Sequence, residues 1–282
     1  MMHNKDKKNI NLEVVKGFGE EWNSFDQSNL SSQEREQIFN QYFSIFPWEL
    51  ISEDSEGFDL GCGSGRWALS MAPKVGKLHC IDPSSSIEVA RKNLSQLDNC
   101  IFHEEGVNSM SLSNDSMDFG YSLGVLHHIS NTQEGINECV KKLKPGAPLL
   151  LYLYYRLENK PFLYRTLWLL SNLFRTFISR LPYFLRAIFT QMIAAFIYWP
   201  LAKLAYLLVI LSVNPGLIPL AEYRDKSFYT MRTDAFDRFA TRLENRFSLD
   251  EIKNMMIHSG LERIVYRDSP PYWCVLGYKK RK

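Results

Sequence analysis

The chain has 282 residues, of which 45% are hydrophobic and 23% are charged, and its formal net charge is +2. This length and composition allow a sizeable core, in one large domain or in one domain with an insertion. A net charge near zero argues against nucleic acid as a partner.

The cysteine pattern and the first residues of the chain predict the cellular compartment of the protein. Five cysteines occur without a CxxC pair, which disfavours a zinc site and a disulfide framework and fits a reducing environment. The first residues lack the apolar run of a signal peptide. We therefore expect a cytoplasmic protein that binds no metal.

Four regions follow one another along the chain. Residues 1–50 contain "GFGEEWNSF" and a polar helix-like stretch, which predicts an N-terminal helical cap. Residues 51–155 alternate short apolar runs with helical patterns. Residues 156–230 are an apolar and basic insertion, and residues 231–282 resume the alternation. Strands that alternate with helices predict an α/β fold with a parallel sheet covered on both faces.

The strands and helices are predicted from apolar runs and helix-capping signals. The strand candidates are residues 58–60, 77–82, 100–105, 117–123, 147–155, 262–268 and 272–280. The helix candidates are residues 84–97, 132–143 and 248–260, the last of which starts with a serine cap and ends at a glycine.

A glycine-rich turn follows the first strand, in "FDLGCGSGRWALSMA" at residues 58–72. Gly61, Gly63 and Gly65 follow a G-x-G-x-G spacing, which differs from the G-x-G-x-x-G of dinucleotide sites and lacks the lysine of a P-loop. Asp82 ends the next strand about 20 residues later, where a carboxylate can hold ribose hydroxyls. The pair of features predicts a nucleoside ligand without phosphates.

Several segments together resemble the class I S-adenosylmethionine (SAM)-dependent methyltransferases. The segments, in this order and spacing, are "DLGCGSG", "IDPSSSIEVAR", "DSMDFGYSLGVLHHI" and "LKPGAPLLLYLYY". The resemblance covers residues 57–155 and resumes over the last helix and strands. It implies SAM as cofactor and a Rossmann-like seven-stranded sheet, mostly parallel, with the last strand antiparallel.

The resemblance also implies which residues contact the cofactor. Those expected from the core are Asp59, Gly61, Cys62, Gly63 and Gly65 around the methionine and ribose, Asp82, Pro83 and Ser84 at the ribose, Val107 and Asn108 at the adenine, and Leu123 near the methyl group. Cys62 is expected as a small packed residue rather than a nucleophile. Many relatives carry an aspartate where this chain has Gly106, so adenine recognition is expected to shift to the backbone or to Asn108.

The N-terminal cap contributes two aromatic candidates. Relatives close N-terminal helices over the cofactor, and here Phe18 and Trp22 could cover the sulfonium, because an aromatic face attracts a cation. A simple hydrophobic cover over the sheet is the alternative.

Methyl transfer from a sulfonium mainly requires that nucleophile, methyl and sulfur be aligned. A hydroxyl acceptor also benefits from a general base within hydrogen-bond reach. His127 and His128 in "GVLHHIS" follow the fourth strand and are the candidates, with His127 favoured. The alternative is that both histidines only pack or cap.

The insertion at 156–213 carries seven basic residues among large apolar side chains, against one acid, Glu158. It could form a lid over the substrate, lie on a membrane surface through residues 160–213, or cross a membrane. We disfavour a crossing because Gln191, Pro200 and Lys203 interrupt the apolar stretch. A lid and a membrane surface can coexist if the acceptor is lipid-linked.

A cluster of phenols and guanidinium groups follows on the return to the sheet. Arginine can bind an anionic acceptor, whereas ion pairing on a helix surface is the alternative. The substrate candidates are Tyr223, Tyr229, Arg232 and Arg242.

The whole chain resembles bacterial methyltransferases with the same basic-aromatic insertion, a group associated with cell-surface saccharide and secondary-metabolite biosynthesis. We therefore expect O-methylation of a small-molecule or lipid-linked acceptor, by a cytoplasmic protein on the inner membrane face. The alternatives are N- or C-methylation and a non-catalytic SAM-binding module docked on a membrane or partner. The sequence predicts neither the acceptor nor the oligomeric state.

Overall fold

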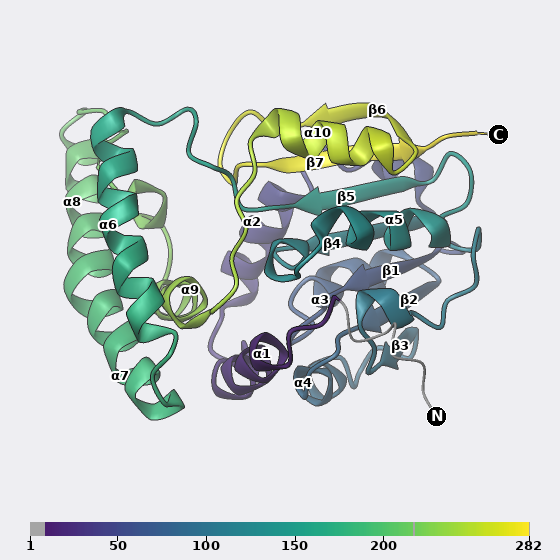
Figure 1. Ribbon diagram of the computed structural model, residues 1–282, viewed down its shortest axis with the longest axis horizontal. Coiled ribbons are helices and arrows are strands. Elements are labelled where there is room, and N and C mark those ends of the chain that lie inside the picture. The colour runs from purple at the N-terminus through teal and green to yellow at the C-terminus, as the bar shows by residue number, and fades with distance from the viewer. Residues whose placement is uncertain (1–8, 217, 282) are drawn as a thin grey trace. The chain divides into compact units, whose positions relative to one another are not determined.

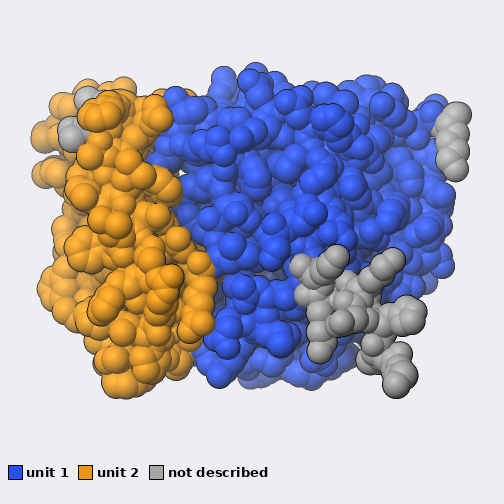
Figure 2. Space-filling view, viewed as in Figure 1, with its two compact units in different colours: residues 1–26, 36–158, 243–282 blue, residues 27–35, 159–242 orange. Residues whose placement is uncertain are grey.

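The computed structural model describes residues 9–216 and 218–281. The chain divides into two compact units (Figures 1 and 2). Unit 1 comprises residues 1–26, 36–158 and 243–282, and unit 2 comprises residues 27–35 and 159–242. Each unit has a core of its own and is described separately.

Unit 1 is built on one seven-stranded sheet with the order β3-β2-β1-β4-β5-β7-β6. β7 runs antiparallel to both β5 and β6, whereas the pairs among β1 to β5 are parallel. This arrangement confirms the predicted Rossmann-like α/β fold. The strands are β1 (Glu56–Leu60), β2 (Lys77–Ile81), β3 (Cys100–His103), β4 (Phe119–Leu123), β5 (Pro148–Tyr152), β6 (Leu261–Tyr266) and β7 (Cys274–Lys279).

Helices cover both faces of this sheet, because its strands are apolar on both sides. One buried cluster joins the sheet to α5 and α10, and a second cluster joins the opposite face to α2, α3 and α4. Each predicted core helix is present. The bounds are α2 (Ser32–Tyr42), α3 (Ala68–Met71), α4 (Ser86–Asn93), α5 (Thr132–Lys142) and α10 (Leu249–His258).

Two helix starts show how local chemistry sets these bounds. The predicted cap of α10 is a reciprocal capping box between Ser248 and Glu251. α4 begins two residues later than predicted, because the Asp82 carboxylate accepts hydrogen bonds from the backbone and hydroxyl of Ser84. These bonds hold the residues after β2 in a turn.

Unit 2 is helical. α6 (Phe162–Ile178) is followed by α7 (Tyr183–Ile193), a π-helical turn (Ala194–Tyr198), α8 (Trp199–Ile210), a short turn (Ala221–Tyr223) and α9 (Phe228–Ala240). The core of unit 2 consists of Ile178, Ala194, Tyr198, Ala202, Met231, Ala235 and Phe239.

α7, the π-helical turn and α8 form one continuous helix over Tyr183–Ile210, 28 residues that are long and apolar enough to cross a membrane. The expectation that Gln191, Pro200 and Lys203 interrupt this stretch was wrong. Pro200 lies in the first turn of α8, directly after the π-helical turn, where a missing backbone N–H is tolerated. We name this element the long helix.

Unit 2 also draws residues 27–35 from the region predicted as N-terminal cap. The Glu34 carboxylate accepts hydrogen bonds from Ser227 N (2.9 Å) and Thr230 Oγ1 (2.7 Å), so it supports the start of α9. The Tyr229 hydroxyl accepts a bond from the backbone of Gln27. Because α9 belongs to unit 2, the chain returns to unit 1 at residue 243, not at residue 231.

Candidate active site

The glycine-rich turn begins where β1 ends. Gly61, Gly63 and Gly65 have φ values of +75°, +53° and +79°, a backbone region that favours glycine. Gly61 N donates to Ile81 O (2.7 Å), which ties the turn to the end of β2. A Cβ atom on Gly61 would lie 2.3 Å from the Val125 side chain, so the loop after β4 packs directly on this turn.

Asp82 connects the end of β2 to the glycine turn. Its buried carboxylate accepts bonds from Gly63 N (3.0 Å) and from Ser84 N (2.9 Å) and Oγ (2.6 Å). A carboxylate accepts about four hydrogen bonds, so Asp82 keeps acceptor capacity for a further donor. The neighbouring Pro83 is half-buried. This geometry fits a ribose hydroxyl at the turn.

Asp59 and Ser64 add unsatisfied polar atoms to the turn. Both Asp59 oxygens and Ser64 Oγ are buried without a hydrogen-bond partner in the described part of the chain. Burial raises the pKa of the Asp59 carboxyl well above its usual range. The nearby Tyr121 hydroxyl lowers this pKa, but it offsets only part of the effect of burial. Buried polar atoms without partners are costly, so these acceptors fit a cofactor that brings its own donors. The sequence did not predict Ser64.

The neighbouring cysteine behaves as expected of a packed residue. Cys62 is buried, and burial raises the pKa of its thiol to about 11. Asn93, at the end of α4, donates to Ser64 O and Asp26 O and fixes the outer side of the turn.

α1 (Leu12–Ser24) brings both predicted aromatic residues to this region. A Cβ atom on Gly63 would lie 2.9 Å from the Trp22 indole nitrogen, so Trp22 packs on the glycine turn. Phe18 lies one helical turn earlier, with its ring centroid 5.0 Å from that of His128. α1 therefore places an aromatic surface between the glycine turn and the histidines. Whether these rings contact the sulfonium stays a prediction.

The loop predicted to hold the adenine is tied to the N-terminal segment. Val107 is buried, and Gly106 packs against Ile10. The Asn108 side chain donates to Glu134 (2.7 Å) and accepts from Asn9 (3.3 Å), so these bonds already engage its amide. Nothing in the sequence pattern linked residues 99 positions apart, which is why Asn9 was missed.

His127 and His128 lie in a short turn after β4, whose last residue, Leu123, is buried. The two imidazole centroids are 4.0 Å apart, and the His127 ring stacks on Tyr154 at 3.8 Å. His128 Nδ1 donates to Leu243 O (2.7 Å), so this nitrogen carries a proton. Neither His127 ring nitrogen has a hydrogen-bond partner in the described part of the chain.

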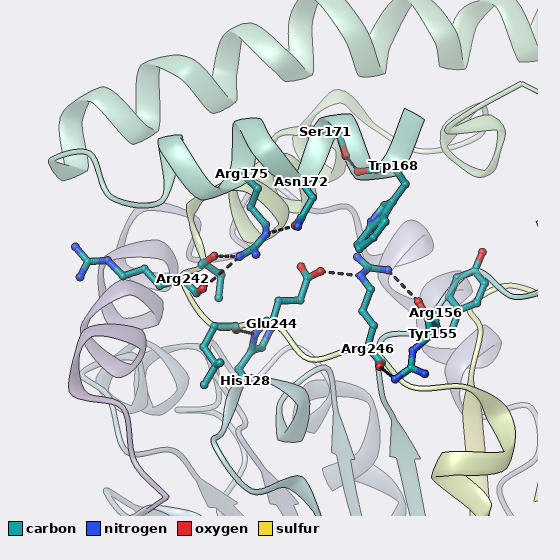
Figure 3. A network of polar contacts seen from close by, with 12 residues as sticks. His128, Tyr155, Arg156, Trp168, Ser171, Asn172, Arg175, Arg242, Glu244 and Arg246 are labelled. Carbon is teal, nitrogen blue, oxygen red and sulfur yellow. Dashed lines mark hydrogen bonds and ion pairs between the residues drawn. The ribbon is translucent and has the colours of Figure 1, made fainter. Parts of the chain in front are cut away.

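Residues 243–247 form an extended segment beside the histidines, which the sequence pattern did not predict. Asn245 N donates to His127 O (2.9 Å), and Phe247 N donates to Tyr154 O (2.9 Å). Arg246 forms an ion pair with Glu244 (2.7 Å) in the same segment (Figure 3). Burial, His128 and Arg246 together hold the pKa of His127 well below its usual range, so this imidazole is neutral.

The four substrate candidates lie in unit 2, where they hold helices together. The Tyr223 hydroxyl donates to Asp234 (2.8 Å), and the Tyr229 hydroxyl accepts from the Gln27 backbone. Arg232 bonds to Gln191, and Arg242 donates to Ser179 O. Arg175, which the sequence grouped with the basic surface, donates to Asn172 and to the carbonyl oxygens of Thr241 and Arg242 (Figure 3).

Comparison with known proteins bears on the core. Residues 58–146 match the family described as "Methyltransferase domain". No curated protein matches the chain.

Several solved structures are similar to this chain. One is a chain in the complex between the Haloferax volcanii Trm112 methyltransferase activator and a methyltransferase, with 13% identity over 91% of this chain and 98% of that chain, and a TM-score of 0.50. A SAM-dependent methyltransferase from Aquifex aeolicus is 13% identical over 91% of this chain and 96% of that chain, with a TM-score of 0.47. A Galdieria sulphuraria structure described as a sarcosine dimethylglycine methyltransferase is 20% identical, with a TM-score of 0.38. The match covers 41% of this chain and 46% of that chain, so this chain spans less than half of that protein.

The strand order, the glycine turn and the carboxylates of Asp59 and Asp82 agree with the family match. The donor and acceptor groups at the turn fit S-adenosylmethionine as the cofactor. Residues 58–146 therefore match the methyltransferase domain family, within a sheet whose strand order is that of a Rossmann-like α/β fold.

Proposed function

We propose that the protein transfers a methyl group from SAM to a hydroxyl oxygen of a small-molecule or lipid-linked acceptor, with His128 as the general base. The observation that carries this proposal is the hydrogen bond from His128 Nδ1 to Leu243 O. It orients the ring, and in this proposal the other ring nitrogen, Nε2, takes the proton. His127, which the sequence favoured, has no bond that orients its ring among the described residues.

Each surrounding residue has a role in this proposal. SAM supplies an activated methyl group when it is bound at the glycine turn. Asp82 holds the ribose hydroxyls, and Asp59 accepts donors of the methionine portion. Phe18 and Trp22 exclude water beside the turn. The acceptor hydroxyl loses its proton to His128 Nε2, while the neutral His127 ring stacks on Tyr154 and supports the His128 ring from one side.

The acceptor class is also part of the proposal. A hydroxyl of a saccharide or secondary-metabolite precursor is supported by the basic insertion, which contains no acid between residues 159 and 221. Such a surface favours anionic molecules, including lipid-linked phosphates. Free cysteines throughout the described chain are consistent with a protein on the cytoplasmic side of the membrane.

Methyl-labelled SAM tests the proposal. The full chain is incubated with label and either the lipid extract or the water-soluble metabolite extract of bacterial cells, and labelled products are isolated. We expect a product whose label is bound to oxygen, and no product from Asp82→Ala. A product labelled at nitrogen or carbon would replace O-methylation, and SAM binding without any product would favour the non-catalytic module.

Two variants locate the base in the same assay. His128→Gln is expected to abolish most of the methyl transfer, whereas His127→Gln is expected to retain it. The opposite result would assign the base to His127.

A further inference from the structure

α6 exposes its apolar side and turns its polar side inward. Leu169, Leu173, Phe174 and Phe177 lie on the exposed side, and Leu173 has 69% of its surface exposed. The less exposed side carries Ser171, Asn172, Arg175 and Thr176 beside Trp168 and Ile178, whereas Arg165 near the start of the helix is exposed. A helix of a water-soluble protein shows the opposite pattern.

Several polar side chains of α6 form hydrogen bonds within unit 2. Ser171 Oγ donates to Trp168 O (2.8 Å), and Thr176 Oγ1 donates to Asn172 O (2.9 Å). Arg175 donates to carbonyl oxygens of residues 241 and 242. Hydroxyl groups bonded back to their own helix are compatible with apolar surroundings.

The long helix packs in the same inverted way. Its buried positions are the small residues Ala194, Ala202 and Ala205 together with Thr190 and Tyr198, whereas most of its large apolar side chains are exposed. Small residues at helix contacts, with large ones outside, are typical of packing in lipid. The exposed large side chains of the long helix are Phe184, Ile188, Phe189, Met192, Phe196, Ile197, Trp199, Leu204, Tyr206, Leu207, Val209 and Ile210.

The positive charge of this region favours an anionic partner for the exposed apolar surface. Residues 159–221 contain six lysines and arginines and no aspartate or glutamate. Arg175, Arg186 and Arg180 bond to backbone carbonyls, and of these three only Arg180 is exposed. Arg165 and Lys203 are exposed as well. Exposed cations beside an apolar surface fit a bilayer with anionic headgroups.

The charged elements packed along the long helix decide how it meets a bilayer. At about 1.5 Å per residue the long helix measures about 42 Å, enough to cross the hydrocarbon. However, α9 packs on α7, and the turn at Ala221–Tyr223 packs on α8. Residues 222–238 contain Glu222, Arg224, Asp225, Lys226, Arg232, Asp234, Asp237 and Arg238. A crossing would take part of this tract into hydrocarbon at high cost, so the contact is one-sided.

We propose that α6 and the long helix insert their apolar faces into one leaflet of an anionic phospholipid bilayer. In this mode the charged α9 stays on the water side, and Arg165, Arg180 and Lys203 meet the headgroups. The proposal is independent of the acceptor and of the base, because it concerns binding to lipid and not turnover.

Vesicle flotation tests the proposal. The full chain is mixed with preformed phosphatidylcholine vesicles, with or without phosphatidylglycerol, and centrifuged under a density gradient, in which bound protein floats and aggregated protein sinks. We expect the wild type to float, more completely with phosphatidylglycerol. The triple variant Leu173→Glu, Phe174→Glu, Phe177→Glu is expected to lose about a hundredfold in partition coefficient, because three large apolar side chains leave the lipid.

The control exchanges three exposed apolar residues of unit 1, in the triple variant Leu50→Glu, Ile257→Glu, Val265→Glu. Binding of S-adenosylhomocysteine to every variant confirms that unit 1 is folded. The control is expected to float like the wild type. Wild type that sinks in both vesicle types, or a control that loses as much binding as the α6 variant, would overturn the proposal. A wild-type oligomer that does not bind vesicles and becomes monomeric in the α6 variant would assign the surface to a second copy of the chain.

Discussion

Unit 1 and unit 2 place their large apolar side chains in opposite ways. Among the described residues, seven large apolar side chains are exposed in unit 1 and 22 in unit 2, although unit 2 is the smaller of the two. Unit 1 buries such side chains on both faces of its sheet. Unit 2 has a small core, in which alanines alternate with a few large residues such as Tyr198 and Phe239, and leaves most of its large apolar side chains exposed. One chain thus contains a part suited to water and a part suited to an apolar surface.

The buried polar groups of the two units differ as well. In unit 1, Asp59, Asp82, His127 and His128 are buried near the ends of β1, β2 and β4. In unit 2, the buried polar residues of the helices are hydroxyls: Thr190 and Thr233 bond to the backbone of their own helix, and Thr230 bonds to Glu34. The buried polar groups of unit 1 can bind or act on a ligand, whereas the buried hydroxyls of unit 2 already form hydrogen bonds within unit 2. This comparison predicts chemistry in unit 1 and attachment in unit 2.

The largest effect on chemistry is expected from His128. His128→Gln should lower kcat by about a hundredfold or more, because a positioned general base contributes at least that much. The measurement is methyl transfer at saturating SAM. SAM affinity should stay unchanged. If His127→Gln lowers kcat as much and His128→Gln does not, the site of the base in unit 1 is misassigned.

The carboxylate at the ribose position should dominate cofactor affinity. Asp82→Ala removes a charged acceptor and should cost about 1.5–3 kcal/mol of SAM binding, roughly a tenfold to a hundredfold loss. Calorimetric titration with SAM and S-adenosylhomocysteine measures it, and NADH should not bind. Asp98→Ala, which changes an exposed aspartate of the same unit, is the control. Equal affinity in both variants would remove Asp82 from the site.

The glycine turn should be sensitive to a single methyl group. Gly61→Ala adds positive-φ strain and a clash with Val125, so it should lower the free energy of unfolding by about 1–2 kcal/mol more than Gly260→Ala does. Gly260 has a similar φ of +89° with no heavy atom within 4 Å of an added methyl group, so this control isolates the crowding. Chemical denaturation measures both. Equal losses would show that strain alone requires glycine at position 61.

Stability should also fall in weak acid because of His127. Its folded pKa lies well below the value of 6.5 that the unfolded chain has, so the unfolded state binds more protons below pH 6.5. The free energy of unfolding should therefore drop as pH falls below 6.5, by up to about 1.4 kcal/mol per pH unit from this residue. His127→Gln should flatten the profile in that window. An unchanged slope would show that His127 titrates normally in the folded chain.

The smallest effect is expected from single charges of unit 2. Arg165→Gln or Lys203→Gln should each weaken binding to phosphatidylglycerol vesicles by about fivefold, since a cation near an anionic surface contributes about 1 kcal/mol. Lys92→Gln, an exposed lysine of unit 1, should have no effect. Flotation at low and high salt gives the measurement. Equal losses of vesicle binding in all three variants would show that the attraction depends on the net charge of the protein and not on the position of the cations.

Patterns that are local in the chain could be predicted. The alternation of apolar runs gave all seven strands, and the spacing of Gly61, Gly63 and Gly65 with Asp82 gave the cofactor turn. Contacts between distant segments could not be predicted, because no periodicity links Asn9 to Asn108, or residues 243–247 to the histidine turn. The continuity of the long helix was missed because a π-helical turn, which has no sequence signature, precedes Pro200.

α1 carries two contacts that belong to different steps of a reaction. Trp22 packs on the glycine turn, Phe18 packs on His128, and Gly19 between them packs closely on Ser85. Because one rigid helix holds both aromatic rings, any displacement of α1 changes both places at once. We expect cofactor exchange and access to the base to share one opening, so that substrate binding and product release are kinetically ordered by the motion of a single 13-residue segment.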